Sequence, residues 1–141
     1  MFRPLRSLYA SGSVVSAKYL LAGRDDTPIN VLVWLAFDGS DKVRRRVAEN
    51  PRTPTPILDM LASDRNSEVR LAVSENRWCS NSLLEILMQD PCDDVRFGIA
   101  ENYYTPIECL EKLTTDQNPH VAWRARKTLT THYRQGFSQA A

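Results

Sequence analysis

The sequence has few of the residues that catalytic and metal sites use most often. Its two histidines, His120 and His132, have no nearby partner at the spacing of a nucleophilic pair or a metal site. The three cysteines, Cys79, Cys92 and Cys109, show no CxxC spacing and give no framework for zinc. We therefore expect no catalytic residues, no metal and no cofactor, and we expect the cysteines to be reduced thiols in a cytoplasmic protein.

Long apolar runs are also missing. No uncharged apolar segment approaches the about 18–20 residues that a membrane-spanning helix requires, so we expect no contact with a membrane. With 43% apolar and 25% charged residues, the composition is that of an ordinary soluble protein. A single soluble domain over residues 1–141 is the expectation.

Acidic residues are absent from both ends of the chain. Residues 1–24 and residues 122–141 each carry four basic residues and no acid, whereas residues 25–121 carry ten basic residues and all seventeen acids. The sequence therefore predicts an acidic body between two basic ends, although its formal net charge is only +1. Such charge separation favours acidic partners at the ends of the chain and basic partners along its body.

A pattern of 26 residues returns along the chain without any slippage of register. It is clearest in three series, which are Leu35, Leu61, Leu87 and Leu113; Asp38, Asp64, Asp90 and Asp116; and Val43, Val69, Val95 and Val121. A constant period of this size indicates a stack of small units, none of which buries its apolar face alone. We predict an all-α solenoid of paired short helices.

Its predicted layout is four repeats preceded by half a repeat. The repeats cover about 27–52, 53–78, 79–104 and 105–127, a capping helix covers 13–23, and a tail covers 128–141. An N-terminus without acids is also typical of an organellar transit peptide. However, Ala17 and Leu21 keep the register of Val43 and Val47, so we expect this segment to belong to the stack.

The helix boundaries follow from residues that commonly begin and end helices. Thr27-Pro28, Thr53-Pro54 and Thr105-Pro106 are expected to start the first helices of about ten residues, with threonine as the cap. Thr105 and Glu108 together predict a capping box, whereas Ser80 or Asn81 is expected to cap the third repeat. The second helices, of about nine residues, are expected to close on Asn50, Asn76 and Asn102 in the left-handed conformation.

The second repeat combines three short motifs, NPxTP at 50–54, LxxLAxD at 58–64 and VR at 69–70. In this combination the chain resembles the leucine-rich repeat variant family of bacterial proteins over about residues 14–127. The resemblance implies a right-handed, HEAT-like α-solenoid and no general catalytic residues. Some members carry an iron–sulfur domain ahead of the repeats, but no cysteine precedes Cys79 here, so that cofactor is not expected.

Lys18, Arg44, Arg70 and Arg96 recur at the repeat spacing, and a solenoid would align them as a ladder along one face. Such a ladder could hold an acidic peptide or a nucleic-acid backbone. The alternative is that each basic side chain pairs with the aspartate series or with glutamates of the same period. The ladder would then be structural.

Large aromatic residues occupy two of the turns that precede first helices. Trp78 and Tyr104 are either contact residues for a partner or hydrophobic staples that pack on the following helix. A further series, Leu71, Phe97 and Trp123, is expected to form core between layers rather than an exposed groove.

The sequence therefore predicts a non-catalytic scaffold or adaptor that binds another protein. The predicted partner-binding residues are Arg44, Arg70, Arg96, Trp78 and Tyr104. A nucleic-acid-binding repeat protein, which would use the ladder and the basic ends, is the alternative. A helical-repeat DNA glycosylase is a weaker one, because this chain is short and its central repeats are acidic.

Overall fold

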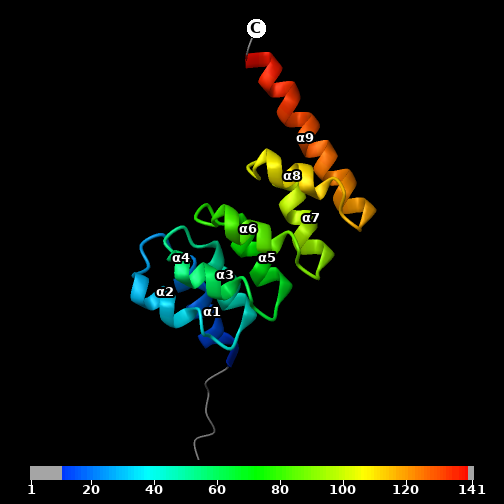
Figure 1. Cartoon of the computed structure of the whole chain (residues 1–141). Helices are drawn as coiled ribbons and strands as arrows, with labels where there is room; N and C mark the ends of the chain where they lie inside the picture. The colour runs from blue at the N-terminus through cyan, green and yellow to red at the C-terminus, as the bar shows by residue number, and fades with distance from the viewer. Residues whose placement is uncertain (1–10, 140–141) are drawn as a thin grey trace, which may run out of the picture.

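The computed structural model describes residues 11–139, and over this part the chain forms nine α-helices and no strand (Figure 1). The all-α fold class is thus confirmed. The helices are α1 (Ser11–Ala22), α2 (Ile29–Leu35), α3 (Asp41–Glu49), α4 (Thr55–Leu61), α5 (Ser67–Glu75), α6 (Asn81–Leu87), α7 (Asp93–Glu101), α8 (Ile107–Leu113) and α9 (Pro119–Gln139). None of these helices has the length and apolar character needed to cross a membrane.

Helices of seven and nine residues alternate along the body. The first helices α2, α4, α6 and α8 have seven residues each, fewer than the ten predicted, and the second helices α3, α5 and α7 have nine. The second helices contact one another in chain order, from α1 through α3, α5 and α7 to α9, and each first helix contacts the helix that precedes it. This arrangement fits an α-solenoid (Figure 1).

The core consists of the periodic leucines and valines. The most deeply buried side chains include Leu32, Leu35, Leu58, Leu61, Leu87, Leu110, Val43, Val69 and Val95. Helices of seven to nine residues are marginal in isolation, so packing between neighbouring helices must supply most of their stability. The core positions predicted from the leucine and valine series are confirmed.

The threonines before the first helices do not cap those helices, which corrects the prediction. Proline is the residue at the helix boundary, and no side-chain cap is present at α2, α4 or α8, including the predicted capping box at Thr105. Instead, the buried hydroxyl groups of Thr27, Thr53 and Thr105 donate to backbone carbonyls of the preceding second helix, six residues earlier. The prediction that Ser80 caps α6 is confirmed, since its hydroxyl accepts the N–H of Leu83.

The asparagines that end the second helices are extended rather than left-handed. Asn50 has φ −71° and ψ 127°, and no described residue has a positive φ. Asn50 Nδ2 donates to the carbonyls of Ala22 and Arg24, and Asn76 Nδ2 donates to those of Ala48 and Asn50. Each of these two asparagines thus ties its layer to the layer before it.

The last helix extends further than predicted. The tail expected over 128–141 is helical as far as Gln139, and Thr128 and Leu129 are buried. Thr128, which follows Asn102 by 26 residues, donates its hydroxyl to the carbonyl of Ala100, so it continues the asparagine connection with a different side chain. The predicted capping helix agrees with α1. The basic residues Arg3 and Arg6 and the last two tail residues lie outside the described part.

Candidate functional site

Each member of the predicted basic ladder forms an ion pair with an aspartate of the next layer. The distances are 2.6 Å for Lys18 Nζ–Asp38, 2.7 and 2.9 Å for Arg44–Asp64, 2.6 and 2.8 Å for Arg70–Asp90, and 2.8 and 3.1 Å for Arg96–Asp116. The three arginine pairs use two guanidinium nitrogens each, a geometry that fixes orientation as well as distance.

The remaining guanidinium nitrogen is also engaged within the chain. Nη1 of Arg70 donates to the carbonyl of Asp64 at 2.7 Å, and Nη1 of Arg96 donates to that of Asp90 at 2.6 Å. The exposed fractions of the Arg44, Arg70 and Arg96 side chains are only 8, 14 and 4%. This geometry favours the structural role over a strip open to a partner.

Two aspartates of the ladder, Asp64 and Asp90, have pKa values below that of free aspartate and ionise more readily. Burial alone would raise the pKa of Asp64, but hydrogen bonds from Arg44 and from the N–H of Asn66, together with nearby positive charge, outweigh it and lower the pKa. The pKa of Asp90 is lowered in the same way by Arg70 and the N–H of Cys92. Ionised aspartate therefore stabilises the folded state.

The stability of the fold should consequently decrease in acid. Because the folded-state pKa of Asp64 and Asp90 lies below the unfolded value of about 3.9, their contribution is complete at neutral pH and is lost as the pH falls from about 5 through the folded pKa. Melting temperatures measured by circular dichroism from about pH 7 to about pH 2.5 check this. The Asp64→Asn, Asp90→Asn variant should melt lower at neutral pH and depend less on pH. A wild-type melting temperature that stays constant into acid would contradict the assignment.

Two aromatic side chains project from the turns that follow the second helices α5 and α7, at the end opposite to the ladder. Trp78 and Tyr104 are 56 and 89% exposed, so the alternative of a buried staple fails most clearly for Tyr104. Asn76 Oδ1 accepts the N–H of Trp78 at 2.9 Å, and Asn102 Oδ1 accepts the N–H of Tyr104 at 3.0 Å. Asn76, which joins two layers, and Asn102 thereby fix the backbone from which the two aromatic side chains project.

Neighbouring side chains extend this surface. The indole Nε1 of Trp78 donates to the carbonyl of Pro51 at 2.8 Å, and the guanidinium of Arg77 lies 5.4 Å from the centre of the indole ring. Tyr103 meets Tyr104 edge to face with ring centres 5.7 Å apart. We call Arg77, Trp78, Tyr103 and Tyr104 the aromatic edge.

The sequence reasoning missed the contact between this edge and α9. The rings of Tyr103 and His132 are stacked with centres 4.1 Å apart, and His132 Nε2 lies 2.6 Å from the carbonyl oxygen of Tyr103. No other repeat has a histidine at the equivalent position, so the 26-residue period gave no signal for the pair. The stacking fixes Tyr103 against the last helix.

The structure does not bring together all of the predicted partner-binding residues. Arg70 bonds to the turn between α4 and α5, whereas Trp78 lies in the turn between α5 and α6. These turns are at opposite ends of α5, which is about 13 Å long at 1.5 Å per residue. The ladder and the aromatic edge are therefore two separate features.

No known family, curated protein or solved structure matches this chain. What it can bind must therefore be inferred from its own surfaces.

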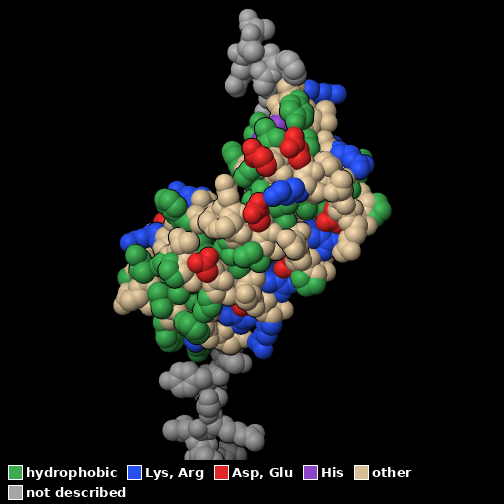
Figure 2. Space-filling model, in the orientation of Figure 1, with side chains coloured by type: hydrophobic (Ala, Val, Ile, Leu, Met, Phe, Trp, Pro, Cys, Tyr) green, Lys and Arg blue, Asp and Glu red, His purple; other side chains and the backbone are tan. Residues whose placement is uncertain are grey.

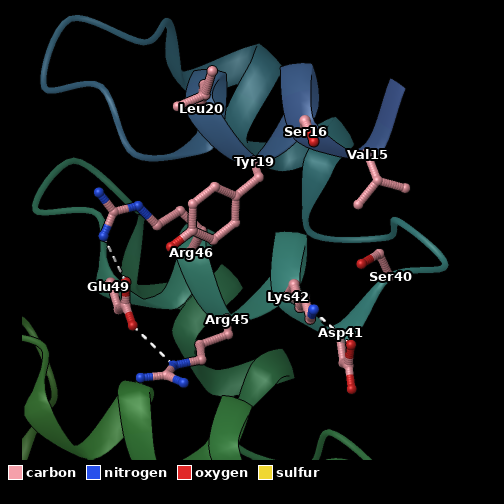
Figure 3. A pocket seen from close by; sticks show the side chains of 10 residues that line it. All are labelled: Val15, Ser16, Tyr19, Leu20, Ser40, Asp41, Lys42, Arg45, Arg46 and Glu49. Atoms are coloured by element: carbon pink, nitrogen blue, oxygen red, sulfur yellow. Dashed lines mark hydrogen bonds and ion pairs between the residues drawn. The ribbon is translucent and has the colours of Figure 1, made fainter. Parts of the chain in front are cut away.

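A hollow on the described surface lies between α1 and α3 (Figure 3). Its lining residues are Val15, Ser16, Tyr19, Leu20, Ser40, Asp41, Lys42, Arg45, Arg46 and Glu49. Glu49 accepts from Arg45 at 2.9 Å and from Arg46 at 2.8 Å, and Arg46 lies over the ring of Tyr19. Three of the lining charges are thus paired with one another, and the lining residues include no histidine or cysteine that could act as a base or nucleophile.

Hydrophobic side chains also gather over the end of the molecule where α1 and α2 lie (Figure 2). The most exposed of them are Leu20, Trp34 and Phe37. Lys18 connects this end to the ladder, because its Nζ both pairs with Asp38 and lies 4.9 Å from the centre of the Trp34 ring.

Proposed function

We propose that this chain is a non-catalytic repeat protein that binds another protein, as a scaffold or adaptor, through the aromatic edge. The observation that carries the proposal is the exposure of Trp78 and Tyr104 on turns whose backbone is fixed by asparagine side chains. Tryptophan, tyrosine and arginine contribute most to protein interfaces, and side chains that are already positioned lose less entropy on binding. Both conditions hold at this edge.

Nucleic-acid binding receives less support from the same geometry. A phosphate backbone needs guanidinium and ammonium groups that are free to bind it, whereas the ladder arginines are bonded to Asp64, Asp90 and Asp116. This alternative would use the ladder and the basic ends of the chain. With the ladder arginines bonded, the basic residues that remain for it in the described part are mainly those of α9, beyond the acidic body. Contacts with phosphate groups would therefore have to be made mainly by α9, at the C-terminal end of the stack.

The remaining features of the proposal follow from the repeat pattern. We place the chain with the leucine-rich repeat variant proteins on the strength of the NPxTP, LxxLAxD and VR motifs, with four repeats and right-handed stacking. The unpaired thiols of Cys79, Cys92 and Cys109 are consistent with a cytoplasmic location. The partner is proposed to be a protein of the same cell.

A double variant, Trp78→Ala, Tyr104→Ala, tests the proposal. The native partner would first be captured from the host with the wild-type protein and identified by mass spectrometry. The variant should fold with a melting temperature close to that of the wild type, because both side chains are more than half exposed and the main loss is one exposed hydrogen bond, from Trp78 to Pro51. It should bind the purified partner at least about tenfold more weakly, as expected for interface hot spots.

The matched control is Trp34→Ala, Phe37→Ala, which removes two exposed aromatic side chains from the α1–α2 end. It should leave the affinity unchanged. If the control weakens binding and the edge variant does not, the edge is not the docking surface. Binding should also survive moderate salt, whereas an affinity that falls steeply with salt would indicate phosphate contacts and contradict the proposal.

A further inference from the structure

A strip of apolar side chains crosses three of the second helices at the border of the core. Leu71 of α5, Phe97 of α7 and Trp123 of α9 occupy the same repeat position. The sequence predicted these residues to be core between layers. The structure leaves Leu71 and Phe97 only partly buried, and Trp123 is 56% exposed.

The strip is continuous between α5 and α7 because of a glycine. A Cβ atom at Gly98 would lie 2.3 Å from Cδ1 of Leu71, so the leucine side chain occupies the place where any other residue would have its own. The equivalent position is Ala72 in α5, but it is Arg46 in α3 and Arg124 in α9. Small residues at this position are thus confined to α5 and α7, in the middle of the stack.

Carboxylates border the strip on both sides. Glu68 and Asp94 precede the apolar residues of α5 and α7 by three positions, and Glu75 and Glu101 follow them by four. Residues three or four apart lie on the same face of a helix, one turn away. All four carboxylate residues are exposed, and we call this surface the acid-bordered strip.

The negative charge of the strip is only partly balanced within the chain. Glu68 pairs with Arg45, and Glu101 pairs with Arg124. Glu75 and Asp94 form no ion pair in the described part of the chain. Burial raises the pKa of Glu75, and the carboxylates of Glu49 and Glu101 add to the rise although Arg45 opposes it. The Glu75 carboxylate is therefore partly desolvated, lies near other acids and has no ion-pair partner of its own in the described part of the chain.

We infer that the acid-bordered strip is a second docking surface, and that its occupant is a basic amphipathic helix of a partner protein. Apolar residues at helical spacing would cover Phe97 and its neighbours, and lysine or arginine on both flanks would approach Glu75 and Asp94. Helices that pack together lie about 8–10 Å apart, so α5, α7 and α9 span about 20 Å. A helix of about three to four turns has this length.

The ends of the strip set its limits. Towards α3 the strip position is occupied by Arg45, and towards the C-terminus Lys127 lies 4.9 Å from the centre of the Trp123 ring. Both cations would repel a longer basic helix. The surface thus selects a short helix, and it does so independently of the aromatic edge.

The test uses purified protein and two synthetic peptides of about fourteen residues that share one amphipathic pattern, one of leucine and lysine and one of leucine and glutamate. Isothermal titration calorimetry of the wild type should show binding of the lysine peptide and none of the glutamate peptide. The Glu75→Gln, Asp94→Asn variant should bind the lysine peptide at least about tenfold more weakly, through the loss of charge pairs. Its melting temperature should change little, because the raised pKa of Glu75 means that its charge opposes folding, which offsets the loss of the favourable Asp94 charge in the first turn of α7.

The control is Asp59→Asn, Glu108→Gln, which removes two exposed carboxylates from the first helices α4 and α8. It should bind within about twofold of the wild type. Equal losses in both variants would show unspecific attraction to an acidic protein, and absence of binding would leave the strip without its proposed occupant. Either result would overturn the inference. A wild-type dimer in sedimentation that dissociates in the Glu75→Gln, Asp94→Asn variant would overturn it as well.

The Trp78→Ala, Tyr104→Ala variant should bind the peptide normally, which separates this test from that of the proposed function.

Discussion

Replacing Arg96 with alanine is expected to destabilise the protein by about 3–5 kcal/mol, as removal of one partner from a buried ion pair does. The side chains of Arg96 and Asp116 are only 4 and 6% exposed. Alanine would leave the Asp116 carboxylate buried without its cation and the carbonyl of Asp90 without its donor. The loss would come from this unpaired charge, since the desolvation of both groups reduces the net value of the intact pair.

Urea unfolding followed by circular dichroism gives the free energy of unfolding that checks this expectation. Arg45→Ala is the matched control, because Arg45 also bonds to two carboxylates, Glu49 and Glu68, but is 50% exposed. Its loss should cost only about 0–1 kcal/mol. Equal effects of the two substitutions would mean that the ladder arginine is no more important to the fold than a surface one.

Truncating a leucine in an inner layer should have a similar effect for a different reason. Leu61→Ala is expected to cost about 2–5 kcal/mol, through lost burial and the cavity that remains. Leu61 is 1% exposed, at the end of α4. Because the first helices have only seven residues, few other apolar contacts are available to compensate.

The same urea titration measures this loss, with Ile86→Ala as the control. Ile86 lies on the first helix α6 but is 65% exposed, so its truncation creates no cavity and should change stability little. A melting temperature unchanged by Leu61→Ala would show that the leucine series is not the core.

The period predicted the helices and the core because a repeated apolar pattern must be buried in the same way in each unit. It predicted Leu61 and Val69 as core residues, and the structure buries both. The capping rules failed for Thr53 and Asn76, because these rules consider only the nearest helix end. Thr53 instead bonds back to Val47 in the preceding helix, and Asn76 bonds to Ala48 in the previous unit. Neither partner is apparent from local sequence.

For the candidate site, the sequence could predict that the ladder residues and the aromatic residues recur at constant spacing. It could not predict which side chains are buried or which surfaces lie side by side. The constant spacing of Arg70 and Asp90 predicted a possible pair, but it did not predict that the pair is largely buried and lies at the opposite end of α5 from Trp78. The stacking of Tyr103 on His132 depends on α9 continuing past the last repeat. The repeat pattern carries no information about that part of the helix.

The asparagine connections limit how the length of the chain can change. Asn50 and Asn76 each reach carbonyls 28 and 26 residues back, and the ladder arginines reach aspartates 20 residues ahead. Insertion or deletion of a few residues would shift all of these partners out of reach, whereas addition or removal of a complete unit would restore every one of them. The array can therefore evolve in length by duplication or loss of whole units, and each such step would lengthen or shorten its surfaces by one layer.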